Sequence, residues 1–206
     1  HHLQSLRVVD KLEKNGQGLN LTFEVRMGIR HHAKGRGGFL SRRPADEQVT
    51  LEAKLVRVAD IIAYVAHDTE DAIRAKVLSP EELPPQVKEV LGPRLSRQID
   101  TMVRDVIHRT RAAGGQHLDM SPQVEQAMVA LREFLYARVY ENPEVHGDFV
   151  KASKVMTDLY GRMLEDDELW AELIGPLPPP ERRARRAADY LAGMTDRYCL
   201  HVYHHY

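Results

Sequence analysis

The stretch "VRVADIIAYVAHDTEDAIR", residues 56–74, decides how we interpret the fold of this chain. Its apolar residues recur at the spacing of an α-helix and do not alternate as they would in a strand. Acids and a tyrosine interrupt the apolar run, and Asp60, Tyr64 and Asp68 follow one another at intervals of four residues. Residues four apart lie one above the other on a helix, so these three side chains are predicted to form one row.

A helical wheel over residues 55–71 separates this row from the rest of the helix. At about 100° per residue, the polar side chains fall within about 100° of arc. They are Arg57, Asp60, Tyr64, His67, Asp68 and Asp71. The remaining arc of roughly 220° is apolar, whereas a surface helix usually has a narrower apolar stripe. We therefore expect this helix to be sunk among its neighbours on the apolar side, which comprises Leu55, Val56, Val58, Ala59, Ile61, Ile62, Ala63, Val65 and Ala66.

Two interpretations of the polar row remain open from the residues alone. The row faces bulk water, or it lines a binding site. The polar arc of the wheel holds acids, a tyrosine and a histidine but neither Lys nor Gln, the commoner residues of a solvent-facing surface. A half-buried acid must be paired, hydrogen-bonded or bound to a metal, because an isolated charge there costs several kcal/mol.

Composition narrows the class of protein. The chain has 206 residues, a formal net charge of −1 and a single cysteine, Cys199. One cysteine excludes an internal disulfide and favours a reducing compartment, and charges break every apolar run well before the ~18 residues of a membrane span. No signal-peptide pattern is present. We expect a cytoplasmic protein without a membrane segment, and the near-neutral charge does not indicate a dedicated nucleic-acid binder.

The rest of the chain also has helical patterns, and no stretch alternates as a strand with hairpin turns. We expect an all-α fold and a single domain over residues 1–206, with a proline-rich connector at 175–181 before the last helix. Ser79 and Glu82 have the spacing of a capping box, and Ser121 before Pro122 is typical of a helix start. Helices are predicted at 3–14, 19–32, 50–78, 94–113 and from Ser121 onward.

Both ends of the chain are rich in histidine. The opening "HHLQSLRVVDKLEKNG" is already an amphipathic helix at its second or third residue, so we expect the chain to begin inside a domain. The first two histidines are either a tag remnant or native sequence, and the same two alternatives hold for the closing "HVYHHY".

Four stretches resemble one known family, in that family's order. "VADIIAYVAHDTEDAIR" is similar to a segment of the deoxynucleotide triphosphohydrolases of the HD superfamily, in their bacterial dGTPase-like branch. "HHLQSLRVVDKLE", "GLNLTFEVRMGIRHHAKGRGG" and "ADYLAGMTDRYCL" resemble three further segments of the same family. The resemblance implies a multi-helix HD-domain array, of which this chain is the C-terminal portion. It also implies the splitting of a deoxynucleoside triphosphate into deoxynucleoside and inorganic triphosphate.

The resemblance assigns roles to the polar row. Family members hold one metal ion with a His, a His-Asp dipeptide and a distant Asp, and Asp60 matches that last ligand. Tyr64 matches a tyrosine that contacts the triphosphate, and Asp68 matches an acid that holds the sugar 3′-hydroxyl. The implied cofactor is a divalent ion such as Mn, Mg or Fe.

Histidines outside the row match the family less completely. His31 and His32 stand where relatives often have Lys-His or Lys-Tyr near the phosphates, and a neutral His at the first position is a weaker phosphate contact than Lys. A solvated pair at a helix end is the alternative. His2 matches a histidine near the attacking water or the scissile phosphate. The dipeptide His67-Asp68 is not interpreted as the metal motif, because no suitable His precedes it in this chain.

These matches lead to a hypothesis with open alternatives. The His and His-Asp ligands are expected before residue 1, so this chain alone is expected to be inactive and metal-free or weakly metal-binding. The intact protein is expected to hydrolyse dNTPs and to form a homo-oligomer; nucleic-acid binding is possible but not indicated. The alternatives are a non-catalytic helical module for nucleotide sensing or oligomerisation, and an HD phosphohydrolase that acts on another nucleotide.

Overall fold

The structure is a computed structural model that describes residues 1–32, 40 and 49–206. The described residues form helices and connecting turns, with no strand among them, which confirms the all-α prediction. The glycine-rich stretch at 34–38 lies outside the described residues. No helix in the described ranges combines the length and the apolar character that a membrane crossing requires.

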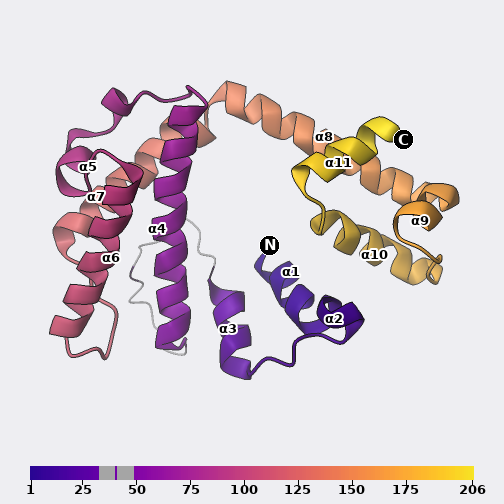
Figure 1. The fold of residues 1–206 in the computed structure, drawn as a ribbon, viewed down its shortest axis with the longest axis horizontal. Helices are drawn as coiled ribbons and strands as arrows, with labels where there is room; N and C mark the ends of the chain where they lie inside the picture. The colour runs from indigo at the N-terminus through magenta and orange to yellow at the C-terminus, as the bar shows by residue number, and fades with distance from the viewer. Residues whose placement is uncertain (33–39, 41–48) are drawn as a thin grey trace. The chain divides into compact units, whose positions relative to one another are not determined.

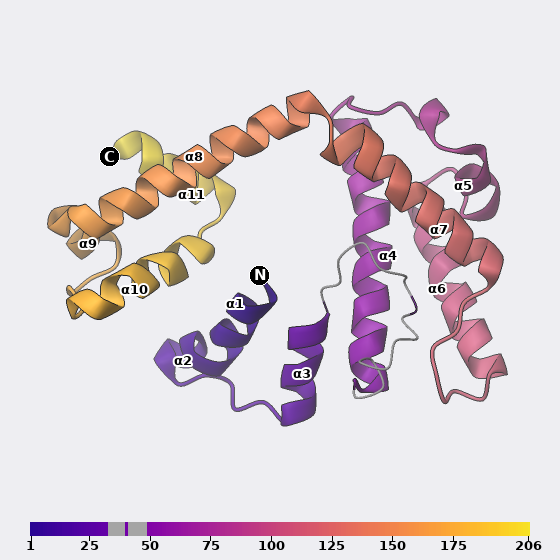
Figure 2. The same cartoon turned by 180° about the vertical axis from the view of Figure 1, so that it is seen from behind.

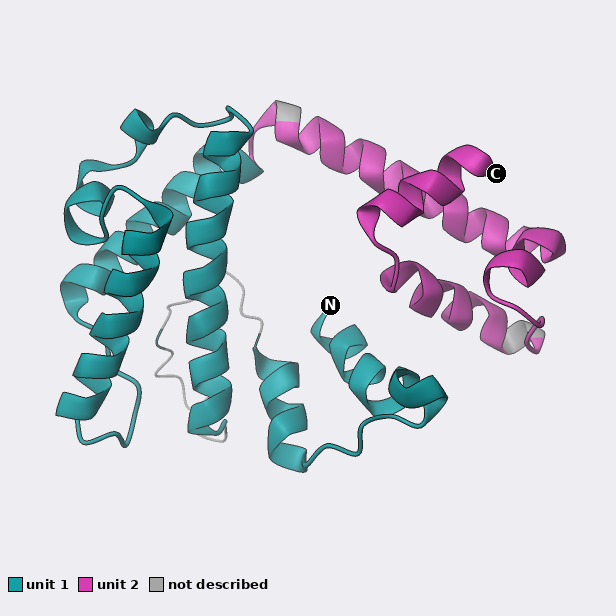
Figure 3. Ribbon diagram, in the orientation of Figure 1, with its two compact units in different colours: residues 1–140 teal, residues 141–206 magenta. Residues whose placement is uncertain are grey.

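The chain divides into two compact units, residues 1–140 and 141–206, which Figure 3 colours separately. Each unit has its own hydrophobic core. Units of this kind can belong to one domain or to two, so the predicted single domain stays a prediction.

Unit 1 begins with short helical pieces where one helix was predicted over 3–14. They are α1 (His2–Arg7), the π-helix η1 (Val8–Leu12) and α2 (Glu13–Gly16). The left-handed backbone of Lys14 and Asn15, with φ of 52° and 56°, kinks this segment. The next helix, α3 (Phe23–His31), starts four residues later than predicted. It starts there because the Thr22 side chain accepts the N–H of Val25, which caps the first turn.

The long helix of the polar row is α4 (Leu51–Arg74). Thr50 caps it by accepting the N–H of Ala53 at 3.2 Å. The helix ends before the predicted Leu78, because the backbone turns left-handed at Lys76, with φ of 60°. In both ribbon views α4 lies between α3 on one side and α6 and α7 on the other (Figure 1 and Figure 2).

The remainder of unit 1 packs against α4 on the side away from α3 (Figure 1 and Figure 2). Its elements are η3 (Pro80–Glu82), α5 (Pro85–Val90), α6 (Leu95–Ala112), α7 (Pro122–Leu135) and the π-helix η4 (Tyr136–Tyr140). The predicted capping box of Ser79 and Glu82 is confirmed, although it opens a 3₁₀ turn of only three residues. Ser121 caps α7 as predicted. The core lies where α4, α6 and α7 meet, and Val65, Met102 and Leu131 are completely buried there.

The expectation that α4 is sunk over its whole apolar arc is wrong in part. Leu55 is 49% exposed and Val56 is 50% exposed, and Ala59 and Ala63 are also exposed. The described helices cover these residues only in part. The wheel therefore grouped the apolar residues correctly but overestimated how many neighbours the helix has.

Unit 2 consists of α8 (Pro143–Glu165), α9 (Asp167–Leu173), α10 (Pro180–Ala192) and α11 (Asp196–His205). Trp170 is fully buried at its centre, and the guanidinium carbon of Arg183 lies 5.2 Å from the centroid of the indole. Two helices follow the proline-rich connector, whereas the sequence predicted one. Pro180 within the predicted connector is already the first residue of α10, a position that proline favours.

Candidate active site

The polar row of α4 meets a second polar row that comes from α7 and η4. Arg132, Tyr136 and Tyr140 are also four residues apart, so they follow one side of this continuous helical segment. The Tyr140 hydroxyl donates a hydrogen bond to Oδ2 of Asp68. The Arg132 guanidinium interacts with the Tyr64 hydroxyl one turn earlier on α4. Two pairs of side chains thus join residues that are about seventy positions apart in sequence.

The π-helix η4 places the tyrosines of the second row. A π-helix widens the turn and changes the direction in which side chains leave the axis, and such segments are frequent at functional sites. The rings of Tyr136 and Tyr140 pack edge to face, with centroids 5.0 Å apart and an interplanar angle of 78°. This contact holds the Tyr140 ring while its hydroxyl reaches Asp68.

Burial keeps both phenols of the two pairs neutral. It raises the pKa of Tyr64, and the Arg132 guanidinium opposes this effect without cancelling it. The pKa of Tyr140 is raised strongly, first by burial and then by the hydrogen bond to Asp68. Both hydroxyls therefore keep their protons around neutral pH and can donate hydrogen bonds. Arg132 is only 8% exposed, so its charge acts with little screening by water.

Asp60 differs from the two later members of its row. Its side chain is exposed, and among the described residues no hydrogen bond or ion pair involves its carboxylate. Within the described ranges no group of three or more His, Cys, Asp or Glu side chains could hold a metal ion. Asp60 can thus supply one carboxylate ligand, but the residues described here do not fit a complete metal site.

The remaining members of the wheel's polar arc have ordinary structural roles. Arg57 is 6% exposed, and its Nε donates to the carbonyl oxygen of His31 at 3.0 Å, which ties α4 to the end of α3. His67 and Asp71 are exposed, and Asp71 pairs with Arg74 at 3.4 Å. The two interpretations therefore apply to different residues: Arg57, Tyr64 and Asp68 are buried or half-buried against partners, whereas Asp60, His67 and Asp71 are exposed.

The candidate histidines gather away from these pairs. Nδ1 of His32 lies 2.6 Å from the carbonyl oxygen of Ile29, and the His32 ring is 5.2 Å from that of His1. His2, on α1, is exposed and packs edge to face against His1 with centroids 5.9 Å apart. His31 contributes its backbone carbonyl to Arg57. The roles predicted for His2, His31 and His32 stay predictions.

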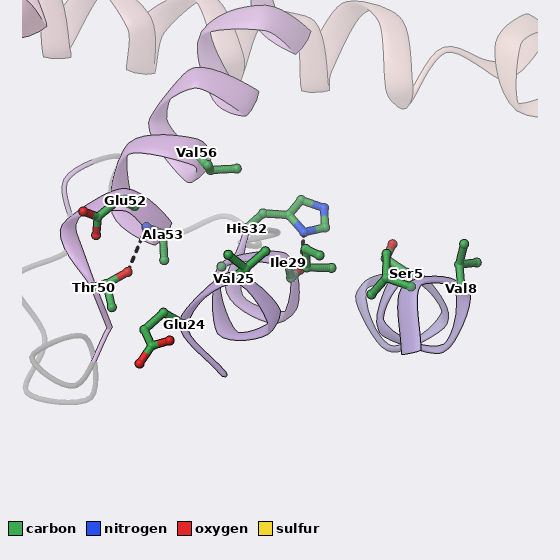
Figure 4. A pocket seen from close by; sticks show the side chains of 12 residues that line it. Ser5, Val8, Glu24, Val25, Ile29, His32, Thr50, Glu52, Ala53 and Val56 are labelled. Atoms are coloured by element: carbon green, nitrogen blue, oxygen red, sulfur yellow. Dashed lines mark hydrogen bonds between the residues drawn. The ribbon is translucent and has the colours of Figure 1, made fainter. Parts of the chain in front are cut away.

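A cavity of about 630 Å³ lies between α1, η1, α3 and the first half of α4. Its lining is mostly apolar, and Figure 4 shows Val25, Ile29 and His32 on one side with Ser5 and Val8 opposite. None of Asp60, Tyr64 and Asp68 lines it. The predicted polar row and this cavity are thus separate features of unit 1.

Sequence reasoning named Tyr64 and Asp68 as candidates but did not name Arg132, Tyr136 or Tyr140, which the structure places beside them. A signal was present, because these three residues repeat the four-residue spacing of the first row. The apolar repeat of the same segment hid it: Val124, Met128, Leu131 and Leu135 define a core face, and Arg132 looks like an ordinary surface residue beside them. Only the packing of α7 on α4 shows that the two polar rows meet.

Comparisons with known proteins show which proteins this chain is similar to. The phosphohydrolase-associated domain family matches residues 118–205. The deoxyguanosinetriphosphate triphosphohydrolase-like protein of Desulfatibacillum aliphaticivorans is 41% identical over 98% of this chain and 60% of its own length. That of Caldanaerobacter subterraneus subsp. tengcongensis is 40% identical over 98% of this chain and 56% of its own length.

A third relative, from Clostridium tetani, has the same name and is 37% identical over 97% of this chain and 57% of its own length. This chain therefore spans a little more than half the length of the curated relatives it matches. The matched regions cover 97–98% of the residues of this chain. Residues 118–205 thus match the phosphohydrolase-associated domain family, and nearly the whole chain is similar to deoxyguanosinetriphosphate triphosphohydrolase-like proteins.

Proposed function

We propose that the intact protein hydrolyses deoxynucleoside triphosphates to deoxynucleoside and inorganic triphosphate, with the help of a divalent metal ion such as Mn, Mg or Fe. The observation that carries this proposal is the meeting of the two rows. It places a buried cation, Arg132, beside Tyr64, and an acid, Asp68, one helical turn further along α4. A nucleotide needs both kinds of group, since its phosphates are anionic and its sugar carries hydroxyl donors.

Arg132 and Tyr64 are assigned to the phosphates. A guanidinium offers several N–H donors in a plane, and charge-assisted hydrogen bonds to phosphate oxygens are about twice as strong as neutral ones. Because Arg132 is buried, its position is fixed before substrate arrives, which favours stabilisation of charge in the transition state. Tyr64 adds a neutral hydroxyl donor on the same side.

Asp68 is assigned to the sugar. Its carboxylate now accepts a hydrogen bond from the Tyr140 hydroxyl, and a sugar hydroxyl is a donor of the same kind. A deoxynucleoside can therefore take one acceptor position of Asp68, either beside Tyr140 or in its place. Asp60, one turn before Tyr64, is left as the carboxylate that would help to hold the metal.

The divalent ion would lower the pKa of bound water from about 15.7 towards about 7 and polarise a phosphoryl oxygen. Asp60 supplies only one ligand, so the other ligands must come from outside the described residues. The 206-residue chain by itself is accordingly proposed to be inactive.

Product analysis tests the reaction class. The intact protein is incubated with each dNTP and Mn²⁺ or Mg²⁺, and the products are separated by ion chromatography. We expect inorganic triphosphate and deoxynucleoside in equal amounts. Release of orthophosphate or pyrophosphate would contradict the proposed reaction, and nucleotide binding without turnover would favour the non-catalytic sensing module instead.

Two alanine variants, each of which replaces one acid of α4, test the assignment of Asp68. In the intact protein, Asp68→Ala is expected to lower dNTP turnover about tenfold or more, because a hydrogen bond to a charged group contributes about 1.5–3 kcal/mol. Asp71→Ala is the matched control, since Asp71 is an exposed acid on the same helix that pairs only with Arg74. Equal activities of the two variants would refute the sugar contact.

The proposed partners are the dNTP substrate and further copies of the same protein. A homo-oligomer is expected from the family resemblance, and sedimentation velocity of the intact protein measures it directly. A single monomeric species over a wide range of concentrations would contradict this part of the proposal.

A further inference from the structure

Two histidines lie side by side on α11, the last helix of unit 2. His201 and His205 are four residues apart, so they share one face of the helix and lie one turn from each other. Their imidazole rings are nearly parallel, with an interplanar angle of 13° and centroids 6.0 Å apart. Both residues are exposed, and neither ring makes a hydrogen bond or ion pair with the described part of the chain. The ring nitrogens are therefore free to take a ligand from solvent.

The helix that carries the two histidines is held firmly to its unit. The Thr195 side chain accepts the N–H of Tyr198 and caps the first turn of α11. Val202 is 1% exposed in the core of unit 2. The Tyr203 hydroxyl donates to Oδ2 of Asp158 on α8 at 3.1 Å. Because α11 is fixed in this way, the one-turn separation of the two histidines is set before any ligand arrives, which lowers the cost of binding.

Two imidazoles one helical turn apart are suited to a particular class of metal ion. Imidazole nitrogen suits zinc, copper and nickel ions, whereas magnesium and manganese ions prefer carboxylate, carbonyl and water oxygens. Histidines at positions i and i+4 of a helix supply two of the zinc ligands in the His-Glu-x-x-His motif. Zinc–nitrogen distances are about 2.0–2.1 Å, so both rings would have to turn toward a common ion. Exposed rings without hydrogen bonds can turn at little cost.

Charges near the two histidines act in both directions. Both lie in the last two turns of α11, and the carbonyl end of a helix favours cations. Arg197 lies one turn before His201, and its positive charge opposes the binding of a metal ion. Water and salt screen both effects at an exposed surface. Coordination by two nitrogens is therefore the contribution that decides binding.

The location of the two histidines separates them from the proposed active site. They belong to unit 2, whereas Asp60 and the residues assigned to the nucleotide belong to unit 1. They also lie within residues 118–205, which match the phosphohydrolase-associated domain family. This match favours native sequence over a tag remnant at both positions.

We propose that His201 and His205 together bind one divalent ion of the zinc, copper and nickel class, with water at the remaining positions. This ion is additional to the one proposed for catalysis, and neither site depends on the other. A structural zinc site has four protein ligands, whereas these histidines supply two. Binding at this site is therefore expected to be reversible and weaker than in a structural zinc site.

Zinc titration of the 206-residue chain, in buffer that contains excess Mg²⁺, tests the proposal. The magnesium occupies sites that are built from oxygen ligands alone. Calorimetry should show saturable binding of Zn²⁺, and the ring resonances of His201 and His205 should shift along the same saturation curve. Absence of saturable binding at submillimolar Zn²⁺, or shifts confined to His1, His2 and His32 of unit 1, would overturn the proposal.

Variants assign the two ligands. His201→Gln and His205→Gln are each expected to weaken zinc binding at α11 by at least about tenfold, since even a residue that only supports a metal ligand contributes about 10–100-fold. His204→Gln is the matched control, because His204 is exposed on the same turn and its ring packs edge to face on Tyr203. All three replaced side chains are exposed, so the variants should keep the circular dichroism of the unmodified chain. Unchanged affinity in His201→Gln or His205→Gln, or an equal loss in His204→Gln, would refute the assignment.

Discussion

The two ends of the polar row on α4 carry the same kind of residue in different surroundings. Asp60 is exposed and has no partner among the described residues, whereas Asp68, two turns later, is half-buried and bonded to Tyr140. The helix itself is regular from Leu51 to Arg74, so the difference does not come from α4. It comes from what packs against each half.

Both α6 and α7 pack along α4, and at its C-terminal half η4 adds two tyrosines to the polar side. The N-terminal half borders α3 and the 630 Å³ cavity, and it leaves Leu55 and Val56 exposed. Helical spacing thus aligns side chains along a row, but the neighbouring helices decide which members of the row become buried, paired or free. Variants along the row test this contrast.

The largest effect is expected at Arg132, which connects the second row to the buried half of α4. Arg132→Ala removes a large buried side chain and the partner of Tyr64, so the free energy of unfolding should fall by about 3 kcal/mol. Urea unfolding followed by circular dichroism measures this change. Arg104→Ala, at an exposed position, should leave the free energy of unfolding nearly unchanged; equal losses would show that Arg132 is not part of a buried contact.

A matched pair of alanines compares the two halves of α4 directly. Ala66 is completely buried and Ala59 is exposed. Ala66→Leu is expected to cost about 1–3 kcal/mol of unfolding free energy, because a packed core has no room for the added carbons. Ala59→Leu should change it by less than about 0.5 kcal/mol. A similar cost at both positions, measured by urea unfolding, would mean that Ala59 is covered as well.

The hydrogen bond between Tyr140 and Asp68 should have a smaller effect that depends on pH. Tyr140→Phe is expected to lower the free energy of unfolding by about 1 kcal/mol at neutral pH. Because the pKa of Tyr140 is raised in the folded state, its contribution is complete below the unfolded value of about 10 and is lost as pH rises through the folded value.

Alkaline pH should therefore destabilise the unmodified chain more steeply than Tyr140→Phe, as measured by thermal unfolding at a series of pH values. Tyr160→Phe is the control, since the Tyr160 hydroxyl makes only a long bond of 3.4 Å to Ala184 in unit 2. Parallel pH profiles for the unmodified chain and Tyr140→Phe would exclude a shifted pKa at Tyr140.

The smallest effect on stability is expected at Asp60. Asp60→Asn should change the free energy of unfolding by less than about 0.5 kcal/mol, because its carboxylate is exposed and contacts no described partner. In the intact protein the same substitution should abolish dNTP hydrolysis if Asp60 holds the metal. Retained hydrolysis, together with unchanged stability, would remove Asp60 from the proposed site.

Much of the fold could be predicted from the sequence, because helix signals are local. Thr50 and Leu51 begin α4 where the pattern indicated, and Ser121 caps α7 as predicted. The errors lie where the backbone departs from a regular helix. Two such places are the kink at Lys14 and Asn15 and the π-helix at 136–140. The residue pattern around each of them resembles that of a regular α-helix, so apolar periodicity does not reveal them.

The sequence by itself determined that Asp60, Tyr64 and Asp68 form one row, since residue spacing and the α-helical repeat suffice for that. Tertiary structure alone decided that Arg132 pairs with Tyr64 and that Tyr140 pairs with Asp68. It also decided that Asp60 has no partner among the described residues. The physical reason is that burial and pairing depend on segments about seventy residues away in the chain. Local periodicity carries no information about which distant helix packs against a given face.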